Sequence, residues 1–354
     1  MAFNVFTNNN LSLSITAGYQ NYTNLISKYV QNGTTIVTES PTILSPYSPP
    51  SSWTCMASNS DGSIQVACTQ TEIYIYRNQT WTSIYLDTGT SLFNSVCMSE
   101  DGRYISATNI DGLYVLNGSG TTYTYSNYSQ SNMKQVCMSS SGQFQLAVSG
   151  GTDSYIYTSS NYGVQWTIIL YPRITFTCCC MSLGGTFQYV FSLVGSIYRS
   201  VNQGTFSFLK TLNLTQIFSC SMSSKPPFIY ILAVSTTKIY VSSSVNWEDT
   251  YTTITPLSGT SPPYSSSVTY DGSSMWVING NVYNSTNYGQ TWNNISIPFS
   301  CSYVFATQNV SFIQNTSPGQ IYTYISGKNG ETPTIQQKQC LDISKNIISF
   351  DKNH

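Results

Sequence analysis

The residue types that most enzymes use for acid–base or metal chemistry are scarce in this sequence. The only histidine is His354, the last of 354 residues. A Ser-His-Asp triad, a Cys-His pair and a histidine-ligated metal all need an imidazole held inside the fold. We therefore expect none of these centres, no metal and no other cofactor.

Carboxylates are the remaining candidates for catalysis. Cleavage of a glycosidic bond uses two facing carboxyl groups, one of them with a raised pKa. Glu248 and Asp249 form an adjacent pair beside Trp247, and Glu72 precedes a strand-like segment. Several other acids stand in Asp-Gly pairs, where turn formation explains them. We expect Glu248 and Asp249 to lie on an exposed loop, with a glycoside hydrolase kept as an alternative.

A short sequence phrase, Cys-Met followed by Ser or Ala, recurs along the chain. Its cysteines form one column when the repeats are aligned. If this phrase forms the innermost strand of each repeat, its thiols surround a central axis. Thiolates that bind one ion must converge on it, and such a ring spreads them too far apart. We expect these residues to pack as small hydrophobic side chains, with a disulfide within Cys178–Cys180 as a further hypothesis. The thiols in this column are Cys55, Cys97, Cys137, Cys180, Cys220 and Cys301.

A second column, an aliphatic residue followed by tyrosine, recurs in register with the first. Its spacing gives a repeat of about 41 residues. Because two columns keep register over seven copies, the repeat cannot be accidental. We expect the tyrosines to pack between repeats, each hydroxyl group finding a polar partner. They are Tyr74, Tyr114, Tyr157, Tyr198, Tyr240, Tyr283 and Tyr322.

Each repeat carries four strand-like segments rich in β-branched and aromatic residues, separated by Gly, Asn and Asp. Asp-Gly pairs such as Asp101-Gly102 and Asp271-Gly272 supply hairpin turns. No helical period persists. Four short strands about every 41 residues predict one blade of a β-propeller. The expected fold is therefore an all-β, seven-bladed propeller with four-stranded antiparallel blades.

The turn before the last strand of a repeat resembles the Asp-box (BNR) motif, Ser/Thr-x-Asp-x-Gly-x-x-Trp, with Asn in place of Asp. This resemblance implies the propeller fold of sialidase-like, sortilin-like and photosystem-assembly-factor-like proteins, and it leaves function open because those proteins differ in activity. Two copies are complete and a third lacks the tryptophan. The turn residues are Ser159, Asn161, Gly163 and Trp166; Ser285, Asn287, Gly289 and Trp292; and Ser200, Asn202 and Gly204.

The repeats divide the chain into three parts. We expect a propeller over residues 51–339, an N-terminal arm over 1–50 and a C-terminal tail over 340–354. A propeller ring is often closed by a strand from one terminus. Either Thr34–Glu39 or Thr334–Gln339 could supply that strand, and the sequence does not decide between them.

Composition limits the partners. Only 8% of residues are charged and the formal net charge is −1, so no basic stripe exists to neutralise nucleic-acid phosphates. The first residues lack the basic and apolar leader of a signal peptide, and no apolar run is long enough to span a bilayer. We expect neither nucleic-acid binding nor membrane insertion.

These observations favour a non-enzymatic structural or interaction propeller that binds other proteins in a large assembly. The polar but nearly uncharged composition suggests the outer part of a virus particle or another outward-facing surface. A glycan-binding propeller is the alternative, because Tyr-, Ser- and Asn-rich surfaces adapt to many ligands. The candidate binding residues are Trp247, Tyr162, Tyr288, Glu248 and Asp249. A degenerate glycoside hydrolase is the second alternative.

Overall fold

The structure is a computed structural model. It forms two compact units, Pro50–Ile321 and Met1–Pro49 together with Tyr322–His354. The described residues are 2–6, 12–16, 53–60, 62–69, 71–78, 80–86, 92–119, 122–129, 132–151, 153–212, 216–224, 230–235, 239–243, 264–279, 281–295, 301–306, 311–315, 321–325 and 334–336.

These residues form antiparallel sheets built from strands consecutive in the chain. A separate hairpin pairs β1 (Ala2–Phe6) with β2 (Ser12–Thr16). The other sheets are β3 (Cys55–Ser58), β4 (Gln65–Cys68), β5 (Glu72–Arg77) and β6 (Thr80–Tyr85); β7 (Ser95–Met98), β8 (Tyr104–Asn109), β9 (Gly112–Ser119) and β10 (Thr122–Ser129); β11 (Met133–Met138), β12 (Gln145–Ser149), β13 (Asp153–Ser159) and β14 (Thr167–Pro172); β15 (Phe176–Met181), β16 (Phe187–Ser192), β17 (Ser196–Val201) and β18 (Ser207–Thr211); β19 (Ile217–Met222), β20 (Ile231–Ser235) and β21 (Ile239–Ser242); β22 (Tyr264–Val268), β23 (Met275–Asn279), β24 (Asn281–Ser285) and β25 (Asn293–Ile295); and β26 (Cys301–Ala306), β27 (Ser311–Asn315), β28 (Ile321–Ile325) and β29 (Thr334–Gln336).

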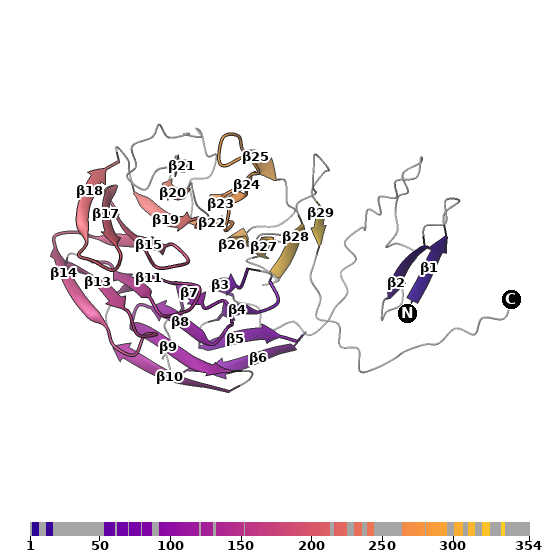
Figure 1. Cartoon of the computed structure of the whole chain (residues 1–354), viewed down its shortest axis with the longest axis horizontal. Helices are drawn as coiled ribbons and strands as arrows, with labels where there is room; N and C mark the ends of the chain where they lie inside the picture. The colour runs from indigo at the N-terminus through magenta and orange to yellow at the C-terminus, as the bar shows by residue number, and fades with distance from the viewer. Residues whose placement is uncertain are drawn as a thin grey trace. The chain divides into compact units, whose positions relative to one another are not determined.

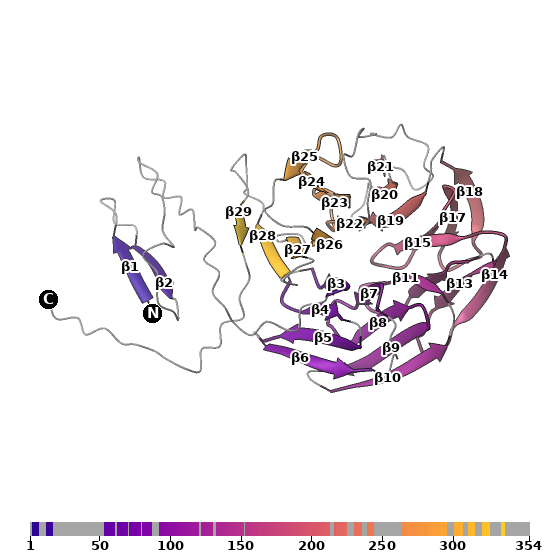
Figure 2. The same ribbon diagram turned by 180° about the vertical axis from the view of Figure 1, so that it is seen from behind.

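The first strands of the sheets surround a common axis. Each contacts the first strand of the next sheet, from β3 through β7, β11, β15, β19 and β22 to β26, and β26 contacts β3. Figures 1 and 2 show these strands innermost, with β6, β10, β14 and β18 on the outside. This arrangement is an all-β propeller with antiparallel blades. Among the described residues, no helix is long and apolar enough to cross a membrane.

The prediction of seven four-stranded blades is wrong, because the described residues form six four-stranded blades. The remaining sheet, β19-β20-β21, contains three strands. After this sheet the described chain resumes at Tyr264. The intervening sequence carries Pro256, Pro262 and Pro263, and proline cannot donate a ladder hydrogen bond. A repeat count from sequence therefore overestimates the number of complete blades.

The core lies between neighbouring sheets. Every side chain of β8, β12 and β20 is buried, as expected for strands covered on both faces. One hydrophobic cluster joins the β3–β6 and β7–β10 sheets, and another joins β15–β18 to β19–β21. Outer strands such as β14 are largely exposed. Each sheet therefore depends on its neighbours to cover its apolar faces.

The last described strand, β29, pairs with β28, with Ile335 opposite Tyr324. It corresponds to the start of the Thr334–Gln339 segment. The other candidate, Thr34–Glu39, lies outside the described residues, as does the tail over 340–354.

Candidate functional site at the axial channel and outer turns

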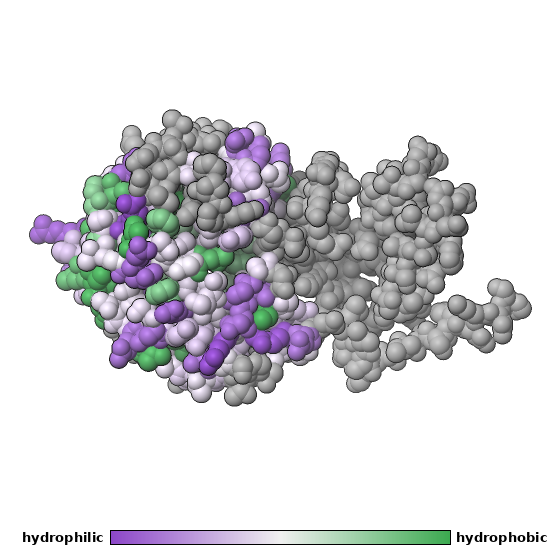
Figure 3. Space-filling model, in the orientation of Figure 1, coloured by the Kyte–Doolittle hydropathy of each residue, from purple (hydrophilic) through white to green (hydrophobic). Residues whose placement is uncertain are grey.

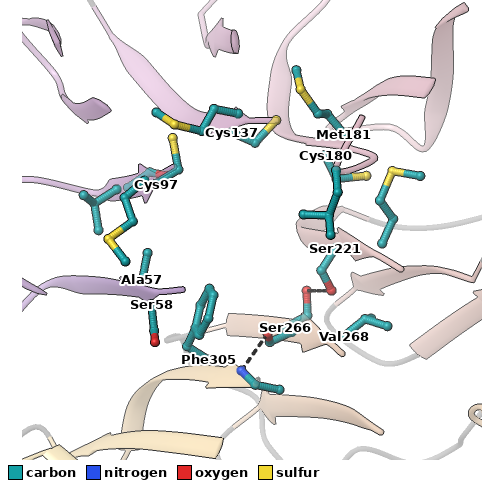
Figure 4. Close-up of a pocket in the computed structure, with 18 of the residues that line it drawn as sticks. Ala57, Ser58, Cys97, Cys137, Cys180, Met181, Ser221, Ser266, Val268 and Phe305 are labelled. Atoms are coloured by element: carbon teal, nitrogen blue, oxygen red, sulfur yellow. Dashed lines mark hydrogen bonds between the residues drawn. The ribbon is translucent and has the colours of Figure 1, made fainter. Parts of the chain in front are cut away.

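A cavity of about 240 Å³ opens along the axis of the propeller. Figure 4 shows side chains from successive first strands surrounding an open space, among them Cys97, Cys137, Cys180 and Phe305. The wall is mainly apolar, with Ser58, Ser221, Ser266 and other hydroxyl groups interspersed. The channel is therefore a hollow that can receive a small apolar group.

The predicted cysteine ring is present in part. Cys97, Cys137, Cys180 and Cys220 line the channel, whereas Cys55 is fully buried between the first two sheets. The side chain of Cys301 lies outside the described residues. Cys179, which was not in the predicted ring, also lines the channel, and its Sγ atom donates a hydrogen bond to a carbonyl oxygen 3.7 Å away, on Gln135.

The described cysteines are free thiols. None of the eight cysteines in this part of the chain forms a disulfide, so the Cys178–Cys180 disulfide hypothesis is not supported. Burial raises the pKa of Cys97, Cys179 and Cys220 well above the ordinary value of 9.0. A protonated thiol is a poor nucleophile and metal ligand. Within the described residues, no group of His, Cys, Asp or Glu is placed to hold a metal ion.

The methionines of the repeated phrase were missed as channel residues. Five successive sheets each contribute one, and the residues are Met56, Met98, Met138, Met181 and Met222. A methionine side chain is flexible and polarisable, so it adapts to differently shaped partners. The Cys-Met phrase already marked their positions, because each methionine lies on the same first strand as a cysteine that was predicted to surround the axis.

Hydrogen bonds connect the turns at one end of the channel. The Glu100 N–H donates to the Ser140 carbonyl oxygen at 2.8 Å, and the Ser140 N–H donates to that of Leu183 at 2.8 Å. The Leu183 N–H donates to Ser224 Oγ at 2.7 Å, and the Ser224 N–H donates to the Tyr270 carbonyl oxygen at 2.9 Å. We call this series the mouth belt. All five of these residues also line the cavity.

Glu100 extends the mouth belt to the first sheet. The Ser60 N–H donates to both carboxylate oxygens of Glu100 at 3.1 Å, and the Ser60 hydroxyl also donates to it. Glu100 was not among the predicted site residues. Its place immediately after the Cys97-Met-Ser phrase is the signal that could have indicated it, because a residue of the first turn of six successive sheets lines the mouth.

The two complete Asn-containing turns have matching geometry. Ser159 Oγ accepts from the Gly163 N–H at 3.0 Å and donates to Asn161 Oδ1 at 3.0 Å. The Trp166 Nε1–H donates to the Gly163 carbonyl oxygen at 3.0 Å. In the second turn the corresponding distances are 2.9, 3.0 and 3.0 Å, between equivalent atoms of Ser285, Asn287, Gly289 and Trp292. The sequence pattern therefore specifies one repeated turn structure.

The third turn differs. Ser200 Oγ donates to the Gly204 carbonyl oxygen at 2.7 Å, and the left-handed positions are Asn202 and Gln203, with φ of 52° and 56°. This turn has no tryptophan, and Phe206 near its end is buried. The turn with the incomplete motif therefore has a different hydrogen-bond pattern from the two complete ones.

Tyr162 and Tyr288 occupy the same position in the two complete turns. Each stacks on a tyrosine of the preceding sheet: Tyr162 on Tyr104 with ring centroids 4.7 Å apart, and Tyr288 on Tyr230 at 5.0 Å. They remain 37% and 42% exposed. One face of each ring is therefore used in packing between sheets, and the rest is open to solvent.

No family model and no curated protein matches the chain. Solved structures do. A structure of YCF48 bound to D1 peptide has a TM-score of 0.57 and 14% identity, covering 78% of this chain and 94% of that one. The β-propeller domain of Myceliophteria thermophila Cps50 (Swd1) has a TM-score of 0.61 and 9% identity, covering 79% and 98%. The chain is a β-propeller. At these identities the similarity shows the fold alone.

Of the predicted binding residues, two lie in the described part of the chain. Tyr162 and Tyr288 lie on turns of different sheets, and Trp247, Glu248 and Asp249 lie outside the described residues. Glu72, the other carboxylate candidate, accepts a hydrogen bond from the Tyr74 hydroxyl at 2.6 Å. That bond gives it a structural partner. In the tyrosine column Tyr114, Tyr157 and Tyr240 are buried as expected, Tyr198 is half-buried, and the side chain of Tyr322 lies outside the described residues.

Proposed function

We propose that this chain is a non-enzymatic interaction propeller that binds other proteins as part of a large assembly, such as the outer part of a virus particle. The observation that carries the proposal is the apolar character of two neighbouring outer strands. On β14, Ile168 and Leu170 are each 51% exposed, and on β18, Phe208 is 58% exposed. Figure 3 shows hydrophobic residues on the left side of the propeller, where Figure 1 places β14 and β18.

An exposed apolar edge strand is uncommon on a protein that stays alone, because its open edge can pair with another chain. Both β14 and β18 stand at the end of their sheets. The equivalent strand β25 presents Asn293 and Asn294 instead. With only 8% charged residues in the whole chain, little charge opposes association at this edge. The YCF48 structure holds a D1 peptide, and we propose that this propeller likewise binds polypeptide.

The proposal is tested by sedimentation of the native protein in extract from its source. We expect it to co-sediment with a large particle through a salt wash. The double variant Ile168→Lys/Leu170→Lys should be released, whereas Ser126→Lys, on the exposed outer strand β10, should stay bound. A protein of 39.1 kDa that sediments as a monomer under these conditions would refute the proposal.

We also propose that the turns at Ser159–Trp166 and Ser285–Trp292 are Asp-box turns with Asn in place of Asp. Their matching hydrogen bonds support this, since Oδ1 of Asn accepts as a carboxylate oxygen would. In both turns it accepts from the N–H four residues later at 2.9 Å.

Glycan binding is a second candidate, favoured by the half-exposed rings of Tyr162 and Tyr288 at equivalent turn positions. An aromatic ring with one open face can stack on a sugar. Screening against a glycan array should then give saturable binding that Tyr288→Ala weakens. Binding unchanged by that substitution, or no binding at all, would remove this candidate.

A further inference from the structure

The charge around the axial channel is of one sign, negative. Among the described residues that line it, Glu100 is the only acidic residue of the Asp/Glu type, and none is Lys, Arg or His. Its carboxylate is positioned at the mouth by the Ser60 N–H and hydroxyl. Hydrogen bonds to neutral donors fix a carboxylate without cancelling its charge. The mouth therefore has an oriented negative charge next to an apolar interior.

The interior beside Glu100 suits an apolar side chain. The methionines of five sheets reach it, and Leu183 and Tyr270 are exposed at its edge. Flexible methionine surfaces accept differently shaped apolar groups. A volume of about 240 Å³ lies below the range of about 300–1,000 Å³ that holds a drug-sized ligand. It fits one or two side chains rather than a folded segment.

We propose that the channel mouth binds an exposed loop of a partner protein that carries an aliphatic or aromatic side chain next to a lysine or arginine. The apolar side chain enters among the methionines, and the cationic group pairs with the Glu100 carboxylate. Charge complementarity selects this partner over an acidic one, because a second negative group would be desolvated beside Glu100 without a counter-charge. This inference rests on the proposed protein-binding function but uses a different surface from β14 and β18.

The test is a selection of phage-displayed, disulfide-closed random heptapeptide loops on the full-length protein. We expect enrichment of loops in which Lys or Arg adjoins Leu, Ile, Met or Phe. A synthetic enriched loop should bind Glu100→Gln roughly two- to fivefold more weakly, since loss of an exposed charge pair has an effect of this order. Gln keeps an oxygen that can accept from the Ser60 N–H, so the mouth belt is retained.

Three controls make the result specific. Glu72→Gln is the matched carboxylate-to-amide change away from the channel lining, and it should leave loop affinity unchanged. Met222→Lys places a positive charge in the channel wall. This charge repels the basic residue of the loop, so the variant should abolish binding. Raising NaCl from about 50 to about 500 mM should weaken loop binding to the unaltered protein, because salt screens an exposed charge pair. This measurement needs no variant to fold.

Four outcomes would each overturn the proposal. They are enrichment of loops without basic residues, enrichment of acidic loops, absence of any enriched loop, and equal affinity of the enriched loop for Glu100→Gln and the unaltered protein. The double variant Ile168→Lys/Leu170→Lys should still bind the loop. Loop binding by a protein that sediments as a monomer would refute assembly and leave the channel site standing. Co-sedimentation of a protein that binds no loop would refute the channel site and leave assembly standing.

Discussion

The ring of Tyr162 stacks on the ring of Tyr104 in the preceding sheet, with centroids 4.7 Å apart and planes inclined by 27°. Tyr162 has a φ of 63°, a left-handed conformation that non-glycine residues seldom adopt. The stack therefore fixes a turn whose backbone is unfavourable for tyrosine. Tyr288 repeats both features, with a φ of 60° and a stack on Tyr230.

This contact should be measurable as an energetic coupling. Tyr104→Ala and Tyr162→Ala combined are expected to destabilise the protein by about 1 kcal/mol less than the sum of the single changes, because an aromatic pair contributes this much beyond burial. Urea unfolding of the four proteins gives the value. Tyr104→Ala combined with Tyr85→Ala, on another sheet, should instead be additive.

A glycine in the first turn of a sheet should be irreplaceable. Gly142 has a φ of +75°, and a Cβ atom there would lie 2.7 Å from Cδ2 of Tyr104. Gly142→Ala should therefore cost at least about 1 kcal/mol and lower the melting temperature by about 2–4 °C. Gly184→Ala is the matched control, because its nearest atom would be 3.8 Å away. Equal melting temperatures for the two variants would contradict this account.

The resemblance to the Asp-box makes its own prediction. Asn161→Asp should change stability by less than about 0.5 kcal/mol, since Oδ1 can still accept from Ser159 Oγ and from the Gln165 N–H. Asn161→Leu removes this acceptor, and with it both hydrogen bonds, and should cost about 1–3 kcal/mol. Thermal unfolding followed by circular dichroism distinguishes the two. An Asp variant as unstable as the Leu variant would show that the turn depends on the amide group.

Stability should decrease in alkaline solution. Burial raises the pKa of the Cys68, Cys97 and Cys179 thiols above 9.0, so the folded protein retains protons that the unfolded chain releases. The stabilisation is fully present below the unfolded pKa and is lost as pH rises above it. The urea midpoint should be constant from about pH 7 to 8 and fall from about pH 9. Cys97→Ala should make this decline shallower, and a flat profile in the unaltered protein would contradict the prediction.

The sequence predicted the propeller because its two columns mark positions that the fold repeats. Tyr114 and Tyr157 are buried between sheets, where a large ring is needed in every copy, so the pattern survives. The blade count failed because a recurrent pair such as Ile239-Tyr240 marks a third strand and contains no information on whether a fourth follows. The motif around Trp166 was recognisable because the side chains of Ser159, Asn161 and Trp166 each make a defined hydrogen bond.

The channel was harder to predict. Which of two adjacent residues reaches the axis depends on the rotation of each blade, and the recurrence of the Cys-Met phrase contains no information on that rotation. Cys55 is packed between sheets while Met56 lines the channel. Glu100 was overlooked because its role depends on Ser60, a residue from another sheet that no local pattern connects to it.

Three links of the mouth belt join one main-chain group to another: Glu100 to Ser140, Ser140 to Leu183, and Ser224 to Tyr270. Every amino acid except proline supplies these groups, so a change of side chain at these positions does not remove a link. Duplicated repeats held together in this way can drift apart in sequence while the circle persists. A propeller of this kind is expected to lose detectable kinship with its relatives long before it loses its shape.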